Sequence, residues 1–504
     1  MGLRDKVAKG AVWATLQTFV GQGVGFVVGM VLARLLTPSD YGTVALLSLF
    51  FAIAGSLASC GFGNALVQKK DAGDLEFNSV FYTSLLISSI IYLVFFFAAP
   101  WIAEFYKTPV LCGVTRVSAL CFIFSAINGV QGAELSRKML FDKRFKISLI
   151  TCAASAVCGI TFAFLGWGVW ALVIASLITS VASVVAYWTI IAWRPKLMFS
   201  FTAVKGLFSY GWKLSLAGLL HTTYSNLSGF LIGKFYTPAD LAFVNKGNSM
   251  PSLFMNAIDG TINSVSFPAL AQIQDDKSKV RDGMRRMIQC STFLVFPLLA
   301  GLCLCARPLI LLLYGSQWEC AIPYVMIACF AFSLHPFNSI NTSAISAIGR
   351  SDVFLLLDII KKSVGVVMII VSLHYGVIVF ALATAFIQSP FAVFVNTFTN
   401  GRLLGYNLKM QLQDVSSTIG LTSAMAAAVY GVQMAIRPLL TFVPEIHVVY
   451  AIQLVVSFVV GVSVFFGLAV YFKPQPFREY VSAAMPMLTR KLSRVAMMVE
   501  RIVK

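Results

Sequence analysis

Long apolar stretches recur along the whole chain, and they constrain its fold more than any other feature. A membrane-spanning helix needs about 20 apolar residues. Only 12% of the residues are charged, about half the usual share in soluble domains, and the shortage extends from end to end. The sequence predicts an all-α integral membrane protein with about 14 transmembrane helices, near 10–33, 42–66, 79–103, 113–133, 147–166, 169–192, 209–233, 241–266, 287–306, 321–346, 355–373, 376–398, 416–436 and 447–472.

The basic residues are distributed unevenly between the two sides of this predicted topology. With the N-terminus inside, the inner loops carry clusters such as 137–146 and 277–286, whereas the outer segments carry few cations. Inner loops of membrane proteins are enriched in Lys and Arg. This bias explains the net charge of +18 without a nucleic-acid partner. It predicts a multi-pass membrane protein with both termini in the cytoplasm.

A repeated motif divides the chain. Residues 33–42 and 233–242 each place a basic residue, Arg34 or Lys234, three positions before Thr-Pro-x-Asp. Six predicted spans separate the copies. An even number leaves both halves in the same orientation, so we expect two six-helix lobes with a parallel pseudo-two-fold repeat.

The repeat defines the predicted domains. The N-terminal lobe covers 1–192 and the C-terminal lobe 208–400. A cytoplasmic connector joins the lobes, two further C-terminal spans follow them, and a basic amphipathic tail is predicted as a helix on the inner membrane surface. These three segments are 193–207, 401–472 and 473–504.

The motif itself is interpreted as architecture rather than as a substrate site. The topology places both copies at the outer ends of spans one and seven. There proline ends one helix, and the aspartate can cap the next.

The sequence gives little support for an enzyme. The four histidines have no carboxylate pair at useful spacing, and there is no Gly-Lys-Ser/Thr phosphate loop. The cysteines show no zinc spacing, and no predicted loop is long enough for a soluble catalytic domain. We therefore predict a transporter with no catalytic residues, no metal site and no cofactor.

Polar residues inside apolar spans are the candidate functional residues, because such groups are costly in a membrane. The candidate substrate-binding residues are Lys246, Asn245, Asn64, Asn128, Gln131, His221 and Asn226. For the amides, hydrogen bonding between helices is the alternative role. Lysine binds phosphate as a point charge, so Lys246 is the candidate for an anionic cargo.

Other charged residues suggest coupling or positioning. Asp259 and Glu134 are the candidates for a coupling-ion site. Arg34 and Lys234 would either extend to the outer interface or line an outward vestibule. Lys362 is expected to pair with Asp358 one helical turn away.

The chain resembles the polysaccharide transporter branch, of the WzxC type, in the multidrug/oligosaccharidyl-lipid/polysaccharide flippase superfamily. The resemblance covers nearly the whole chain. The motifs that carry it are Leu-Ala-Arg-Leu-Leu-Thr-Pro-Ser-Asp-Tyr-Gly (32–42), Gly-Phe-Gly-Asn-Ala-Leu-Val-Gln (61–68), Phe-Val-Asn-Lys-Gly (243–247) and Ser-Phe-Pro-Ala-Leu-Ala (266–271). The chain departs from the family pattern at Ala242 and Phe243, where Gly and Tyr are usual.

The resemblance implies a flippase that moves undecaprenyl-pyrophosphate-linked oligosaccharides by alternating access, for O-antigen, capsule or exopolysaccharide synthesis. Its expected partners are this lipid-linked oligosaccharide, membrane lipids and the polysaccharide polymerase machinery. Two alternatives stay open. One is a drug or organic-cation exporter of the same superfamily, and the other is a membrane polysaccharide polymerase or ligase.

Overall fold

The computed structural model describes residues 3–436, 438 and 445–482. Contacts between residues divide the chain into two compact units, 1–242 and 243–504, and each unit is considered by itself. We call them unit 1 and unit 2.

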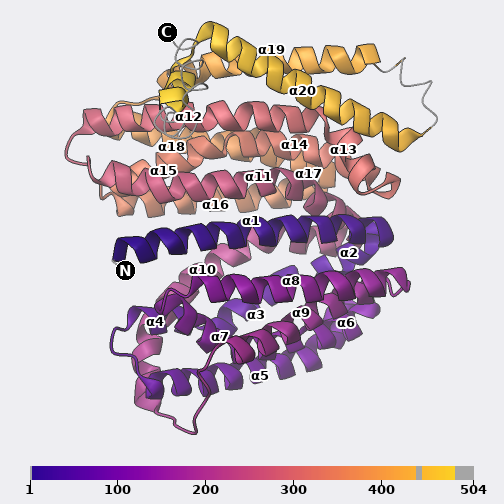
Figure 1. Ribbon diagram of the computed structural model, residues 1–504, viewed down its shortest axis with the longest axis vertical. Helices are drawn as coiled ribbons and strands as arrows, with labels where there is room; N and C mark the ends of the chain where they lie inside the picture. The colour runs from indigo at the N-terminus through magenta and orange to yellow at the C-terminus, as the bar shows by residue number, and fades with distance from the viewer. Residues whose placement is uncertain (1–2, 437, 439–444, 483–504) are drawn as a thin grey trace. The chain divides into compact units, whose positions relative to one another are not determined.

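Unit 1 contains ten helices in chain order, and an eleventh, α11, begins in it. Their bounds are α1 Leu3–Leu35, α2 Pro38–Ala45, α3 Ser48–Ser59, α4 Phe62–Gln68, α5 Asp74–Phe105, α6 Val110–Ser118, α7 Leu120–Arg137, α8 Phe141–Phe164, α9 Val169–Ile190, α10 Phe201–Phe235 and α11 Pro238–Ala271 (Figure 1).

Unit 2 continues from α11 with helices that include one 3₁₀ segment (η1) and one π segment (η2). Their bounds are α12 Lys277–Leu304, α13 Ala306–Leu313, η1 Ser316–Ala321, α14 Ile322–Ser333, α15 His335–Ala347, α16 Ser351–His374, α17 Val377–Ala383, η2 Thr384–Gln388, α18 Ser389–Leu404, α19 Leu408–Ile436 and α20 Ile446–Phe472.

The helices confirm an all-helical, multi-pass membrane protein. Within the described ranges, ten helical segments are long and apolar enough to cross a membrane. The other four predicted spans lie in α1, α10, α11 and α16, which carry more polar or charged residues. The C-terminal part of α1, Val20–Leu35, forms a shorter apolar helix.

The two Thr-Pro-x-Asp motifs form the same helix cap. Thr37 accepts a hydrogen bond from the backbone N–H of Asp40 at 3.3 Å, and the Asp40 carboxylate accepts one from the Thr37 N–H at 3.0 Å. Thr237 and Asp240 repeat this arrangement at 3.2 and 3.1 Å. These reciprocal bonds satisfy backbone donors at the starts of α2 and α11. The sequence predicted that the aspartates cap these helices. Instead Thr37 is the cap residue of α2, and Asp40 bonds back to the Thr37 backbone from the third helical position, an arrangement that Thr237 and Asp240 repeat.

The second motif approaches α2 closely within unit 1. A Cβ atom added at Gly42 would lie 1.7 Å from the carbonyl oxygen of Pro238. Only glycine permits this backbone approach, because any side chain at position 42 would overlap Pro238.

Separate apolar clusters hold each unit together. In unit 1, α1, α8 and α9 pack around Leu32, Leu36 and Ala171, while α4, α5, α7 and α10 share a second cluster. In unit 2, α12 packs with α15 and α19, and α19 lies beside α20 (Figure 1).

The unit boundary and the predicted lobe boundary follow different criteria. Helix α10 packs against α3, α4 and α5, so contacts place it in unit 1, whereas the repeat assigns it to the second lobe. The lobes and the connector 193–207 stay predictions. Most of the predicted amphipathic tail, residues 483–504, lies outside the described residues.

Candidate functional site

Unit 1 contains a polar pocket of about 410 Å³ between α7, α8 and α9. We call it the hydroxyl pocket. Most of its lining groups are uncharged hydroxyls and glycines: Ser125, Asn128, Gly129, Gly132, Thr151, Thr179, Ser180, Ser183 and Tyr187. The volume falls within the range of small-molecule sites, about 300–1,000 Å³.

Two amides of α7 lie at or near this pocket. Asn128 donates a hydrogen bond to the Ser183 hydroxyl of α9 at 3.0 Å, and its own carbonyl oxygen is buried without a described hydrogen-bond partner. Gln131, one helical turn further, is fully buried. Neither polar atom of its amide has a partner among the described residues, and Gln131 does not line the pocket.

Unit 2 has a corresponding pair of amides three residues apart, Asn338 and Asn341 on α15. Asn338 accepts a hydrogen bond from Asn396 of α18 at 3.1 Å. Asn341 exchanges two hydrogen bonds with Gln411 of α19, each 3.0 Å long, and accepts a third from Asn400 at 2.8 Å. We call Asn341, Asn400 and Gln411 the amide network.

The predicted coupling residue Asp259 has a partner that the sequence did not identify. His335 Nδ1, at the start of α15, lies 3.0 Å from the Asp259 carboxylate of α11. His335 also lines a polar pocket of about 350 Å³ with Asn338, Ser339, Thr342 and other residues of α15. An imidazole and a carboxylate thus lie in contact beside a polar cavity within unit 2.

Lys246 lies among aromatic rings. Its ammonium nitrogen is 3.9 Å from the ring centre of Tyr314 and 5.3 Å from that of Trp318. The faces of aromatic rings attract cations. The adjacent Gly247 allows this arrangement, because a Cβ there would lie 2.4 Å from Cβ of Tyr324 on α14.

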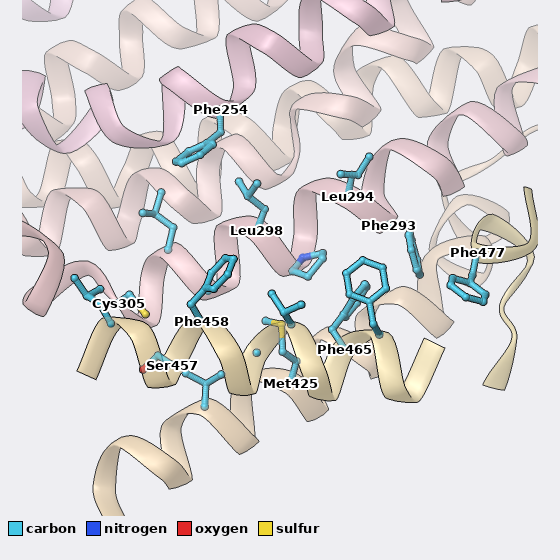
Figure 2. Close-up of a pocket in the computed structure, with 18 of the residues that line it drawn as sticks. Phe254, Phe293, Leu294, Leu298, Cys305, Met425, Ser457, Phe458, Phe465 and Phe477 are labelled. Atoms are coloured by element: carbon cyan, nitrogen blue, oxygen red, sulfur yellow. The ribbon is translucent and has the colours of Figure 1, made fainter. Parts of the chain in front are cut away.

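A large apolar cavity of about 820 Å³ lies between α12, α19 and α20. We call it the apolar cavity. In Figure 2, Leu294 and Leu298 of α12 face Phe458 and Phe465 of α20, with Phe254 of α11 at the far side. Its lining is almost entirely hydrocarbon, with Ser457 among the few polar contributors.

The remaining predicted residues are dispersed. Asn64 on α4, Asn245 on α11 and His221 on α10 are exposed. Asn226 donates a hydrogen bond to the Thr222 carbonyl of its own helix at 2.9 Å.

The predicted vestibule and ion-coupling residues also have local contacts. Arg34 is exposed at the end of α1. Lys234 lies 3.6 Å from the ring centre of Phe105 and donates to its carbonyl oxygen. Glu134 pairs with Lys138 at 2.6 Å. The expected Asp358–Lys362 pair is confirmed at 2.7 Å.

Sequence reasoning missed several residues of these sites. Ser183, Thr179 and Tyr187 complete the hydroxyl pocket, and Gln411 completes the amide network. Ser183, Thr179 and Tyr187 are polar residues inside a predicted apolar span, which was the available signal, whereas Gln411 lies between two predicted spans. Their partners come from distant helices, so spacing within one helix could not identify them.

Comparison with known proteins decides the family. A family model described as "Polysaccharide biosynthesis protein" matches residues 31–323, more than half of the chain. The chain belongs to this family. The predicted membership of a polysaccharide biosynthesis family is thereby confirmed.

Two bacterial proteins are similar to this chain over most of their length. The Teichuronic acid biosynthesis protein TuaB of Bacillus subtilis (strain 168) is 23% identical, with 86% of this chain and 90% of that protein covered. The Lipopolysaccharide biosynthesis protein WzxC of Escherichia coli (strain K12) is 23% identical, with 72% and 74% covered.

The fold matches a solved flippase. The inward closed conformation of lipid II flippase MurJ superposes with a TM-score of 0.69 at 16% identity, covering 91% of this chain and 98% of that one. This polysaccharide biosynthesis protein therefore shares the flippase fold.

Proposed function

We propose that the protein moves undecaprenyl-pyrophosphate-linked oligosaccharide units across the bacterial inner membrane for O-antigen, capsule or exopolysaccharide synthesis. In this proposal about 14 helices cross the membrane as two six-helix lobes, in parallel pseudo-two-fold repeat, plus two C-terminal helices. Both termini lie in the cytoplasm. The lobes rock about the connector 193–207 and expose the cargo alternately to each side.

The observation that carries the proposal is the apolar cavity. Two of its three main walls, α19 and α20, lie outside the internal repeat. A transporter of sugars alone has no need of a hydrocarbon-lined cavity of about 820 Å³. A polyprenyl chain supplies the matching apolar surface, and a hydrocarbon lining accepts it without the cost of burying unpaired polar groups.

Charged residues supply the other parts of the proposed mechanism. Lys246 is the proposed pyrophosphate contact, with its aromatic neighbours Tyr314 and Trp318 orienting the ammonium group. Asp259 and Glu134 stay the proposed coupling-ion sites.

The other sequence-based assignments also stay proposals. Arg34 and Lys234 would form the outer vestibule. Asn64, Asn128, Gln131, Asn245, His221 and Asn226 would contact the cargo. The polysaccharide polymerase is the proposed partner that receives the transported unit.

A drug exporter for organic cations is less well supported. Such a site needs an available carboxylate, and Asp259 and Glu134 were its only plausible candidates. Asp259 lies against His335, and Glu134 is paired with Lys138. The family match to polysaccharide biosynthesis also favours a glycan cargo.

Complementation of a deletion strain tests the proposed function. Loss of the protein should abolish the surface glycan and leave lipid-linked units on the cytoplasmic side, and accumulation on the outer side would instead support a polymerase or ligase. Gly301→Phe should fill the apolar cavity, since Gly301 lines it and its Cβ direction is open. The matched variant Gly420→Phe on exposed α19 surface should complement fully. Normal surface glycan in the deletion strain would refute the proposal.

A further inference from the structure

The hydroxyl pocket differs in its chemistry from the charged candidate sites described above. None of its lining residues is charged, so it offers neither a cation for phosphate nor a carboxylate for an organic cation. It is also too polar to suit a hydrocarbon chain. Serine and threonine hydroxyls both donate and accept hydrogen bonds, and five such side chains surround the space, namely Ser125, Thr151, Thr179, Ser180 and Ser183.

The amide at the pocket has unused hydrogen-bonding capacity. The Asn128 side chain is held by its bond to Ser183, while its carbonyl oxygen is buried and has no partner in the described parts of the chain. Buried polar atoms in proteins are nearly always hydrogen-bonded. A ligand hydroxyl in the pocket would supply the missing donor once a rotation of the Asn128 side chain exposes this oxygen.

The shape of the pocket depends on two glycines of α7. A Cβ at Gly129 would meet nothing within 4 Å, and one at Gly132 would meet only the Tyr187 hydroxyl at 3.7 Å. The helix surface therefore leaves open space where larger side chains would fit without a clash. The phenol of Tyr187 borders that space. Apolar or aromatic surface with a few directed polar groups is typical of small-molecule sites.

We propose that the hydroxyl pocket binds one or two sugar residues of the transported glycan, with Asn128 and Ser183 as hydrogen-bonding contacts. The inference rests on the proposed function and assigns the glycan part of the cargo to a site within unit 1. An uncharged, polyhydroxylated ring matches a pocket lined by hydroxyls and one amide without fixed charge. The lipid part is assigned to the apolar cavity of unit 2.

Binding to the full-length protein in lipid nanodiscs tests this site. The probe is the water-soluble oligosaccharide released by mild acid from the lipid-linked intermediate of the host strain, titrated calorimetrically. Gly129→Leu should weaken its affinity by about tenfold or more, equivalent to about 1.4 kcal/mol. The matched control Gly420→Leu places the same side chain on an open, exposed part of α19 and should bind like the wild type.

A second pair of variants separates sugar contact from helix packing. Asn128→Ala should also weaken binding by about tenfold. Asn400→Ala removes a comparable interhelical amide contact in unit 2 and should leave affinity unchanged. Melting temperatures of all four variants show whether each protein is folded.

The outcomes distinguish the site from the proposed function. Wild-type affinity in Gly129→Leu and Asn128→Ala, or no binding by the wild-type protein, would overturn the sugar site even if complementation shows a flippase. Oligosaccharide binding that these variants weaken would support the site. If the deletion strain still displayed its glycan, only the transport function would fall.

Discussion

Corresponding helices of the two units use buried amides in different ways. In unit 1, Asn128 of α7 reaches α9, while Gln131 has no described partner. In unit 2, Asn338 of α15 is joined to α18, and Asn341 is bound by Gln411. Two amide pairs with the same three-residue spacing thus form an open arrangement in one unit and a closed network in the other.

The difference follows from a contact that helix α19 makes in unit 2. Helix α19 supplies Gln411, whose amide forms reciprocal hydrogen bonds with Asn341. Among the described residues, no side chain of unit 1 supplies such a partner to Gln131. The comparison teaches that an added helix can convert a polar crossing from a potential binding surface into a structural contact.

Gly42→Ala should have the largest effect. It also compares the two motifs, because position 42 is glycine and the matching position 242 is alanine. The added methyl group would overlap the Pro238 backbone, so we expect at least about 3 kcal/mol of destabilisation, the upper range for overpacking. Ala242→Gly at the matching position should lose only about 1 kcal/mol through helix propensity. Unfolding of the purified variants in detergent measures both. Equal effects at the two positions would contradict the close approach.

Gln411→Met tests the closed network. The change preserves side-chain size but leaves the buried amide of Asn341 without its reciprocal partner. We expect a loss of about 2 kcal/mol, because an unsatisfied buried polar group costs about 1–3 kcal/mol. Chemical unfolding in mixed micelles provides the measurement. Stability within about 0.5 kcal/mol of the wild type would show that the network contributes little.

Gln131→Met applies the matched substitution to the open arrangement, and the expected sign is reversed. The wild-type amide is fully buried and unpartnered among the described residues, so replacing it with a thioether should raise stability by about 1 kcal/mol. The same unfolding assay, combined with surface-glycan complementation, measures stability and transport separately. A destabilised variant would reveal that Gln131 has a stabilising interaction after all.

Thr37→Ala and Thr237→Ala should have the smallest effects and should agree with each other. Both threonines make the same cap, and loss of such a cap costs about 1 kcal/mol. Unfolding free energies of the two single variants should therefore match. A clear difference between them would indicate that the motifs have separate roles.

Much of the fold could be predicted from the sequence. Hydropathy identified stretches that all lie in helices, since membrane insertion depends on the composition of a segment. A cap within each Thr-Pro-x-Asp motif was also predictable, because the bonded residues lie three positions apart, although the threonine rather than the predicted aspartate is the cap residue.

The candidate sites were only partly predictable. Asn128 was recognised as a polar residue in a span, but its contact with Ser183 depends on how α7 and α9 are rotated against each other. Lys246 was recognised as an intramembrane cation, whereas its aromatic neighbours lie on segments about 70 residues away.

The sequence by itself determined an all-helical membrane protein and the polar positions within it, because composition and local capping act over a few turns of chain. Only the tertiary structure decided that Asn341 is enclosed by Gln411, that Gln131 is not satisfied in the same way, and that hydroxyls of three helices surround one pocket. Hydrogen bonding depends on distance and direction between side chains, and these follow from helix packing rather than from the residues of any one helix.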